Sequence, residues 1–430
     1  MKKLVLSLAI VLAASFTNAQ ELTKEQIKQQ KKEIKALMSV VEDAESNLAA
    51  DPEAAALAVK AAQNSPLVNK NAYVWYVSAN AKMAVMNNEN RKRAEGAPCD
   101  EEKLYNYAYE FGNDLAECDR CDNLPDEKGR IKPQYTNFIN TSYGQQFGQF
   151  YNAGAYFYGN ENYEKAYYLF KMFIDASDKL YKVGMMPKDT VNVPVAAYNM
   201  SLCGMQMKKY DLVLTHVDMA MMHPDFAPAA FRYKTAAYLE LGDTAKWLDL
   251  CKEGTIKFPQ DAYFNQALIQ YYDSRNESDK LDALADELIA SDPSNPLFVY
   301  LKGYIAQSKY ESNEEEYKDL LEVAIDWYKK TLVINPDYET ALANLGRCYL
   351  LKAQAYSNQQ SSTKITDKKK LAQDKEVLNG FYNEALPLYE HLRNVAPDRK
   401  DYWFNGLMNC YYNLNMMDKV EELEKLMPEE

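Results

Sequence analysis

The chain is poor in glycine and in histidine. Only 15 of its 430 residues are glycine and only 3 are histidine. It contains neither a glycine-rich loop that could cradle a phosphate group nor the Gly-x-Ser-x-Gly motif of many serine hydrolases. Alternating runs rich in valine and isoleucine, which would indicate β-strands, are also missing. These absences argue against a β domain and leave little support for an enzyme.

The histidines do not form a metal-binding pattern. His216 and His223 are seven residues apart, and no glutamate lies between them at the spacing of a metalloprotease helix. A zinc site would need a second pair of ligands, and only His391 remains. The carboxylate runs Glu314–Glu316 and Glu421–Glu422 lie in strongly charged stretches and are typical of solvated helix faces. The sequence therefore predicts no enzyme, no metal and no cofactor.

No apolar run is long enough to span a membrane. The run Leu4–Phe16 has 13 residues, whereas a spanning helix needs about 20. Two lysines precede this run and the small residues Thr17–Ala19 follow it, which is the pattern of a secretory signal peptide covering residues 1–19. An uncleaved N-terminal membrane anchor is the alternative. No cysteine follows the cleavage point, which disfavours a lipoprotein anchor. We expect export to a bacterial periplasm or to the cell exterior, with association with the outer membrane left open.

Basic residues are outnumbered by acidic ones. The chain has 49 lysine and arginine residues against 62 aspartate and glutamate residues, and loss of Lys2 and Lys3 changes the net charge from −13 to −15. Such a charge repels nucleic acids and anionic lipids, so we expect no nucleic-acid partner. A hydrophobic content of 47% is enough for a large buried core.

Prolines recur in the second half of the chain at a nearly constant interval. They are separated by 35, 34, 43 and 61 residues, at Pro224, Pro259, Pro293, Pro336 and Pro397. Self-similarity near 34 residues indicates one pair of helices repeated many times, each pair burying its apolar face against its neighbours. The sequence therefore predicts an all-α fold, an α-solenoid.

The repeat unit combines small and aromatic residues at fixed places. Leu345, Gly346 and Tyr349 lie on one expected helix, and Ala385, Tyr389 and Pro397 lie on the helix expected to follow it. Small residues let two helices approach closely, aromatic residues fill the space beside them, and proline ends the second helix. This pattern resembles the tetratricopeptide repeat (TPR). The resemblance implies a right-handed superhelix of about nine helix pairs covering nearly the whole mature chain.

Two irregular segments interrupt the repeats. The stretch 123–142 contains Pro125, Gly129 and Pro133 and predicts a linker between N-terminal degenerate helix pairs at 20–122 and a main array at 143–430. The stretch 357–378 is rich in Gln, Ser, Thr and Lys and lengthens the interval between two prolines to 61 residues. We expect this insertion to extend one helical hairpin with a basic, mobile tip.

The seven cysteines fall into two groups. Cys203, Cys251, Cys348 and Cys410 occupy packing positions of expected helices and are interpreted as small buried apolar residues. Cys99, Cys118 and Cys121 lie in or beside the irregular region, and an exported context permits a disulfide of Cys99 with either Cys118 or Cys121. The spacing of Cys118 and Cys121 matches a redox motif, but the strand-to-helix context of that motif is missing.

The first helix of each pair is expected to line a concave groove. Residues beside the packing positions would point into it, and they are aromatic, amide or guanidinium groups: Tyr151, Tyr158, Tyr198, Asn199, Arg232, Gln266, Gln270, Tyr300, Tyr304, Arg347, Asn405, Asn409 and Tyr412. Such groups suit a peptide backbone or a sugar and require no charge on the ligand. TPR domains that clamp a C-terminal carboxylate use Lys, Asn and Arg on successive first helices, and the corresponding positions here differ.

Two functions remain open at this point. The resemblance implies a non-enzymatic scaffold of the bacterial cell envelope that binds a protein or peptide partner in the groove, within an envelope complex. The alternative is a periplasmic or surface binding protein for a glycan or another polar ligand.

Overall fold

The computed structural model describes residues 23–126, 128–259, 261–361 and 368–426, and these residues form helices and loops without a β-strand. The predicted signal peptide, residues 1–19, lies outside the described residues. The chain divides into two compact units, Met1–Trp247 and Leu248–Glu430.

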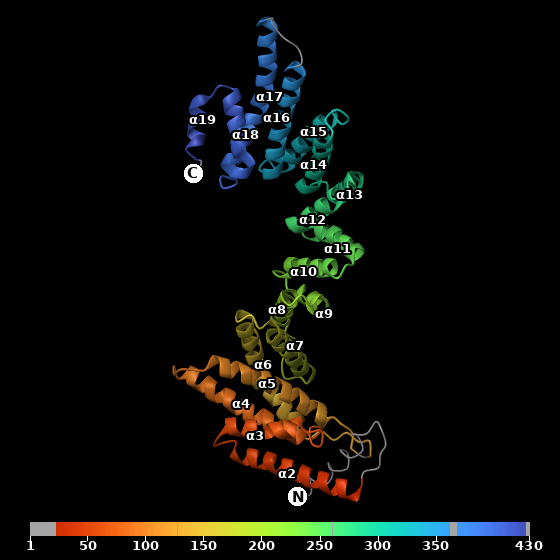
Figure 1. Ribbon diagram of the computed structural model, residues 1–430, viewed down its shortest axis with the longest axis vertical. Helices are drawn as coiled ribbons and strands as arrows, with labels where there is room; N and C mark the ends of the chain where they lie inside the picture. The colour runs from red at the N-terminus through yellow and green to blue at the C-terminus, as the bar shows by residue number, and fades with distance from the viewer. Residues whose placement is uncertain (1–22, 127, 260, 362–367, 427–430) are drawn as a thin grey trace. The chain divides into compact units, whose positions relative to one another are not determined.

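The described residues form eighteen helices (Figure 1). Those of the first unit are α2 (Lys24–Asn47), α3 (Pro52–Asn64), α4 (Ala72–Ala94), α5 (Glu101–Asp122), α6 (Thr136–Gly159), α7 (Tyr163–Lys182), α8 (Asn192–Gln206), α9 (Tyr210–Ala220) and α10 (Ala227–Glu240). Helix α11 (Thr244–Lys257) crosses the boundary between the units. Those of the second unit are α12 (Ala262–Asp273), α13 (Ser278–Ser291), α14 (Pro296–Ser312), α15 (Leu320–Ile334), α16 (Glu339–Ser361), α17 (Lys368–Val395), α18 (Lys400–Asn413) and α19 (Met417–Glu424).

Within each unit, helices pack mainly against their neighbours in the chain. The most extensive contacts join α4 to α5, α6 to α7, α8 to α9, α14 to α15 and α16 to α17. The eighteen described helices, packed in this sequential way, correspond to nine consecutive pairs, each with a first and a second helix. The predicted all-α solenoid of about nine TPR-like pairs is confirmed.

The periodic prolines lie just beyond the ends of second helices, as predicted. Helices α11, α13, α15 and α17 end at Lys257, Ser291, Ile334 and Val395, and a proline follows two residues after each end. Proline lacks an N–H and clashes with the preceding helical turn, so it prevents the helix from continuing.

Several turns inside the pairs share a second periodic feature. Each contains one residue with left-handed backbone, and Lys208 (φ 55°), Gly242 (φ 80°) and Asn276 (φ 54°) are spaced 34 residues apart. The next residue donates its N–H to the carbonyl five positions earlier, at 2.9 Å in all three turns, and the second helix begins one residue later. This is a Schellman-type helix end, and it sets the short reversal between the two helices. Glu161 and Asn415 have the same conformation in two further turns.

Glycines on first helices allow close approach of aromatic residues from second helices. An added Cβ at Gly303 would lie 2.6 Å from the ring of Tyr328, and one at Gly346 would lie 2.6 Å from the ring of Tyr389. Both rings are buried. The predicted packing of a small residue against an aromatic residue is confirmed for these pairs.

The two irregular segments differ in the structure. Helix α6 already begins at Thr136, so the connection after α5 is shorter than the stretch 123–142, and the buried carboxylate of Asp122 closes it by accepting the N–H groups of Gln134 (2.8 Å) and Tyr135 (2.7 Å). Phe111 and Phe150 stack across this connection with ring centroids 6.1 Å apart. The division at 20–122 and 143–430 stays a prediction.

The insertion lengthens α16 and α17, as expected for an extended hairpin. These helices have 23 and 28 residues, and the hydroxyl of Tyr356 donates a hydrogen bond to Asp374 (2.9 Å) across them. The tip of the insertion, residues 362–367, lies outside the described residues.

Candidate partner-binding surface

First helices of the second unit carry polar stripes that face one another. The side chains on α14 are spaced by four, three and four residues, and those on α16 by three and one, so each set lies on one helix face. The residues are Tyr300, Tyr304, Gln307 and Glu311 on α14, and Asn344, Arg347 and Cys348 on α16.

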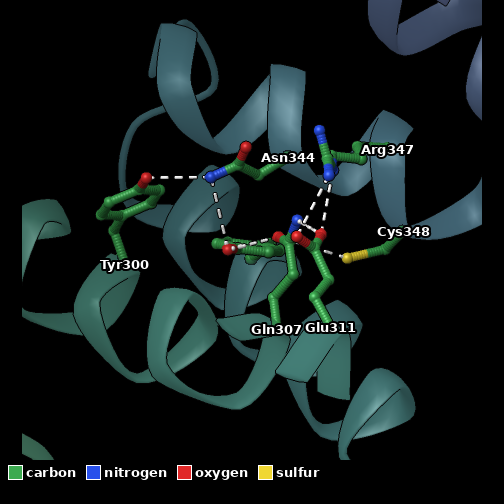
Figure 2. Close-up of polar contacts among 7 residues, drawn as sticks. Tyr300, Gln307, Glu311, Asn344, Arg347 and Cys348 are labelled. Carbon is green, nitrogen blue, oxygen red and sulfur yellow. Dashed lines mark hydrogen bonds and ion pairs between the residues drawn. The ribbon is translucent and has the colours of Figure 1, made fainter. Parts of the chain in front are cut away.

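Hydrogen bonds join these stripes to the hydroxyl of the buried Tyr328 on α15. Figure 2 shows the labelled residues of both stripes and their polar contacts. The amide of Asn344 donates to the hydroxyl of Tyr300 at 2.9 Å and, at 3.4 Å, to the hydroxyl of Tyr328. The hydroxyl of Tyr328 donates in turn to Oε1 of Gln307 at 2.8 Å. The tyrosine ring is 0% exposed, so this bond satisfies a phenol that water does not reach.

The network continues from the interior to the surface. The amide of Gln307 donates to Oε1 of Glu311 at 2.8 Å, and Arg347 binds both oxygens of this carboxylate, at 2.9 Å and 3.1 Å. The thiol of Cys348 donates to Gln307 at 3.6 Å. Because the guanidinium is held by a carboxylate on the neighbouring first helix, Arg347 presents a paired charge to a ligand rather than an isolated one.

The tyrosines of this stripe contribute to packing as well as to the surface. Tyr300 is half-buried and its ring lies 5.6 Å from that of Tyr328 and 5.5 Å from that of Tyr338. The hydroxyl of Tyr304 donates to Asp273 at 2.7 Å. Burial raises the pKa of both Tyr300 and Tyr304, so both phenols stay protonated and act as fixed hydrogen-bonding groups.

Other predicted residues of the second unit lie open to solvent. Gln266 and Gln270 are exposed on α12, and Asn405 and Asn409 are exposed on α18. Tyr412, also on α18, is 65% exposed. Asn405, Asn409 and Tyr412 are spaced by four and three residues and share one face of the helix. They form an exposed stripe within the predicted set.

The predicted residues of the first unit are mostly half-buried between neighbouring pairs. The amide of Asn199 on α8 donates to the hydroxyl of Tyr151 on α6 at 3.2 Å, and the ring of Tyr151 contacts Phe170 and Phe173 edge-on. Tyr198 stacks on Phe226 with ring centroids 4.6 Å apart. These tyrosines therefore help to hold consecutive pairs together.

The remaining two residues of this group differ in exposure. Tyr158 is half-buried, and its ring meets that of Tyr163 across the turn between α6 and α7. Arg232 is exposed on α10. The structure thus divides the thirteen predicted residues into two sets, one in each compact unit.

Sequence reasoning missed a ladder of amides in the first unit. Gln146 donates to Asn87 at 3.0 Å and Gln149 donates to Asn90 at 3.3 Å, so the first helices α6 and α4 are joined twice. Both bonds connect residues 59 positions apart. The repeated separation of 59 residues between two Asn and Gln pairs is the available signal, but it does not fit the period of 34 that the prolines indicate.

A network of buried charge in the first unit was also missed. Lys82 on α4 and Asp114 on α5 form an ion pair at 2.7 Å, and both side chains are at most 7% exposed. Ser78 and Gln63 donate further hydrogen bonds to the carboxylate of Asp114. Because its members are inside the helix packing and satisfy one another, we interpret this network as structural.

The cysteines are free thiols in the structure. Helix α5 separates Cys99, just before its start, from Cys118 near its end by about 25 Å at 1.5 Å per residue, and a disulfide needs Cα atoms within about 7 Å. The structure therefore does not bring Cys99 to Cys118 or Cys121. Those two thiols contact the carbonyl oxygens of Ala72 and Asn69 instead, each at 3.6 Å.

The other four thiols are buried, as predicted. Cys203, Cys251, Cys348 and Cys410 are each 0% exposed. Burial raises the pKa of each of these thiols to about 12, so none is a thiolate near neutral pH. They pack as small apolar side chains.

Among the described residues, no three His, Cys, Asp or Glu side chains come together in a way that could hold a metal ion. None of the helices that the structure describes is both long and apolar enough to cross a membrane.

No protein-family model and no curated protein matches this chain. Among solved structures, it is similar to a TPR repeats protein from Bacteroides fragilis, at 17% identity over 64% of this chain and 98% of that one, with a TM-score of 0.29. It is also similar to the TPR domain of P58(IPK), at 16% identity over 89% and 99%, with a TM-score of 0.32. A third is the TPR2AB domain of yeast Sti1 in complex with pHSP90, at 12% identity over 63% and 98%, with a TM-score of 0.21.

Scores this low carry no inference about function or partner. The helix pairs, their Schellman-type turns and the contacts between small and aromatic residues are features of this chain itself. The fold is therefore an α-solenoid of helix pairs that resemble tetratricopeptide repeats.

Proposed function

We propose that this protein is a non-enzymatic interaction scaffold of the bacterial cell envelope, which binds a protein or peptide partner on the exposed faces of its first helices. The observation that carries the proposal is the composition of these faces. Their exposed members are amides, guanidinium groups and one phenol: Arg232, Gln266, Gln270, Arg347, Asn405, Asn409 and Tyr412.

These groups match the chemistry of a peptide backbone. An amide side chain offers two donors and an acceptor, which can pair with the N–H and C=O groups of an extended chain or a loop. A tyrosine adds contact area and one hydroxyl at a small cost in conformational entropy. The surface requires no fixed charge on the partner, since Arg347 is already paired with Glu311.

Export is part of the proposal and rests on the sequence. Lys2 and Lys3, the apolar run Leu4–Phe16 and the small residues before Gln20 form the three parts of a signal peptide. A mature protein with a net charge of −15 would then work outside the cytoplasm. Mass spectrometry of the exported protein should find an N-terminus near Gln20, and an intact Met1 would contradict this part of the proposal.

The amide ladder of the first unit favours a second candidate function, binding of a glycan or another polar ligand. Asn87 is exposed, and it is already oriented by the hydrogen bond from Gln146. Amides held in place in this way can pair with sugar hydroxyls with little loss of side-chain freedom.

The test is a comparison of two triple variants. Asn405→Ala, Asn409→Ala and Tyr412→Ala together remove the accessible stripe of α18, and their exposure predicts an unchanged helical spectrum. We expect this variant to capture at least about tenfold less partner from envelope extract than the wild type does. Each residue that anchors a partner contributes ~1 to 4 kcal/mol to binding. The matched control is Val333→Ala, Asn383→Ala and Glu384→Ala on second helices, where the residues are also exposed.

Two outcomes would count against the proposal. Equal loss of capture in both variants would show that the face of the first helices has no special role. Retention of an isolated glycan by the wild type, and its loss on Asn87→Ala but not on the α18 variant, would favour the second candidate instead.

A further inference from the structure

The amide ladder of the first unit keeps hydrogen-bonding groups that the protein does not use. Gln146 and Gln149 on α6 donate to Oδ1 of Asn87 and Asn90 on α4, which forms two rungs. Among the described residues, the Nδ2 groups of Asn87 and Asn90 donate to no other atom. The Oε1 atom of Gln149 is buried and has no hydrogen-bond partner in the part of the chain that the structure describes.

The rung of Asn90 and Gln149 therefore offers a donor and an acceptor to a ligand. A buried carbonyl oxygen without a donor is unfavourable, so a ligand that supplies one stabilises the site. A hydroxyl group suits this rung, because its single oxygen can donate a proton to a carbonyl and accept one from an N–H group. Asn87 is exposed and Asn90 is half-buried, so the ladder reaches solvent.

The helix that carries the glutamines is uncharged. None of the 24 residues of α6 and none of the 15 residues of α8, the next first helix, is Asp, Glu, Lys or Arg, although 26% of the whole chain is charged. On α4, Glu89 lies between the two asparagines in sequence, but it is 1% exposed and is paired with Lys92 at 2.8 Å. The ladder is therefore suited to a neutral ligand.

The spacing of the rungs favours a sugar over an extended peptide. Three residues separate the rungs on each helix, which is ~4.5 Å along the helix axis. Hydroxyl groups on alternate carbons of a sugar ring can reach two rungs at this spacing. An extended peptide parallel to the helices presents equivalent backbone groups on one side only every ~6.6 Å, which is two strand residues.

An aromatic residue lies on the same face of α6 beyond the ladder. Tyr156 is seven residues, or two helical turns, after Gln149. It is half-buried, and its ring centroid lies 4.9 Å from that of Tyr105. An aromatic ring can pack against the apolar face of a sugar while amides bind the hydroxyl groups. The distance of ~10 Å along the helix from Gln149 to Tyr156 requires a ligand of more than one sugar ring.

We propose that the amide ladder and Tyr156 form a binding site for a neutral oligosaccharide of two or more sugar units. Asn87 and Asn90 donate to hydroxyl groups of one unit, Gln149 accepts a hydroxyl proton, and Tyr156 packs against a further unit. This site rests on the second candidate function above and specifies its location, the neutrality of its ligand and the minimum length of that ligand. It does not involve the exposed stripe of α18.

Titration of the purified protein with neutral trisaccharides tests the proposal. The probes are maltotriose, mannotriose and galactotriose, and nuclear magnetic resonance of the side-chain amides reports binding. We expect at least one probe to shift the signals of Asn87 and Asn90. The signals of Asn88 and Asn137, which are exposed on other faces of α4 and α6, should not shift. Because the site is neutral, a rise in ionic strength from about 0.1 M to about 1 M should change the affinity less than about twofold.

Variants of the ladder locate the site. Asn87→Ala with Asn90→Ala removes both donors and should weaken binding of the trisaccharide at least about tenfold. Tyr156→Leu should weaken it at least about threefold, because the aromatic surface is lost. The matched control, Asn88→Ala with Asn137→Ala, makes the same change on the same two helices and should leave the affinity unaltered. Circular dichroism checks that each variant is folded, and the shifts in the wild type decide if the ladder variant is not.

The outcomes separate this site from the proposed function. A trisaccharide that binds the folded ladder variant as tightly as the wild type would overturn the site and leave the second candidate function standing. Binding of none of the three probes would overturn both. Tighter binding of a trimer of galacturonic acid, or a shift of the Asn87 and Asn90 signals by a blocked alanine tetrapeptide and not by the sugars, would overturn the neutral oligosaccharide as the ligand. Capture of a protein partner by α18 is measured independently and does not depend on these results.

Discussion

At the scale of single residues, several turns inside the pairs contain a residue whose left-handed backbone costs conformational free energy. Lys208 and Glu161 have left-handed backbone, which costs an L-amino acid with a Cβ about 1 kcal/mol or more, whereas Gly242 has the same backbone without this penalty. The chain uses lysine, glycine, asparagine and glutamate at one equivalent position. The hydrogen bonds of the Schellman-type turn therefore outweigh the backbone preference of the residue at this position.

Substitution at this position should change stability in opposite directions. Lys208→Gly relieves the left-handed strain and should raise the free energy of unfolding by up to ~1 kcal/mol, after the greater entropy of glycine in the unfolded chain is subtracted. Gly242→Ala introduces the strain and should lower it by ~1 kcal/mol. Urea denaturation of both variants measures these changes, and shifts of the same sign would contradict the assignment of the turn.

The buried thiols make stability depend on pH. Burial holds the pKa of Cys203, Cys251, Cys348 and Cys410 at about 12 in the folded protein, against 9.0 for an ordinary thiol. Between these values the unfolded chain releases thiol protons that the folded chain retains, so stability is intact below pH 9 and is lost as the pH rises above it. Each thiol contributes up to about 1.4 kcal/mol per pH unit in that range.

We therefore expect the midpoint of thermal unfolding to be level between about pH 7 and pH 8 and to fall above pH 9. Replacing the four cysteines by alanine should make the fall shallower, with the remaining slope due to buried tyrosines such as Tyr300. A midpoint that rises between pH 9 and pH 10.5 would show that these thiols are not buried in the folded protein.

At the scale of helices, the spacing of small and aromatic residues determines how close two helices lie. The ring of Tyr328 fills the space beside Gly303, and a methyl group there would meet it at 2.6 Å. Gly380 on α17 has no heavy atom within 4 Å of such a methyl group. The two glycines therefore provide a matched pair.

Gly303→Ala should destabilise the second unit by ~1 to 3 kcal/mol, because overpacking forces the buried ring to move. Gly380→Ala should be neutral or stabilising by up to ~1 kcal/mol, since alanine is the better helix former. Thermal unfolding of both variants measures the difference. Equal effects would mean that the contact with Tyr328 does not require glycine at position 303.

The helices could be predicted from the sequence, and the orientation of their side chains only in part. The intervals between Pro224, Pro259 and Pro293 located the ends of the pairs because proline acts locally on the backbone. The difference in exposure between Tyr300 and Tyr412 could not be predicted in this way, since both are tyrosines on first helices. Their difference arises because Tyr338 and Asn344 cover Tyr300, while Tyr412 lies near the last turn of α18, where no later first helix follows among the described residues.

Polar contacts between pairs were the least predictable part. The bond from Gln146 to Asn87 and the ion pair of Arg347 with Glu311 depend on how far one pair is rotated on the next. That rotation is set by the sum of many side-chain volumes and has no short sequence signature. The possible disulfide of Cys99 is not formed, because α5 runs without interruption from Glu101 to Asp122 and keeps Cys99 away from Cys118 and Cys121.

At the scale of the whole molecule, the packing residues repeat from pair to pair while the exposed groups on first helices vary. Arg232 is exposed on α10, Gln266 and Gln270 are exposed on α12, and Asn405, Asn409 and Tyr412 are exposed on α18. This separation allows a partner to be recognised without disturbing the core. It also places the proposed partner-binding surface on the first helices.

The central claim is that a partner binds the faces of the first helices, and site-specific photocrosslinking tests it most directly. A photoreactive amino acid is placed at Asn409 on α18 in one variant and at Val333 on α15, which is 84% exposed, in the other. After illumination in envelope extract, we predict a discrete adduct to one partner from position 409 and none from position 333. An adduct from position 333 with none from position 409 would contradict the account.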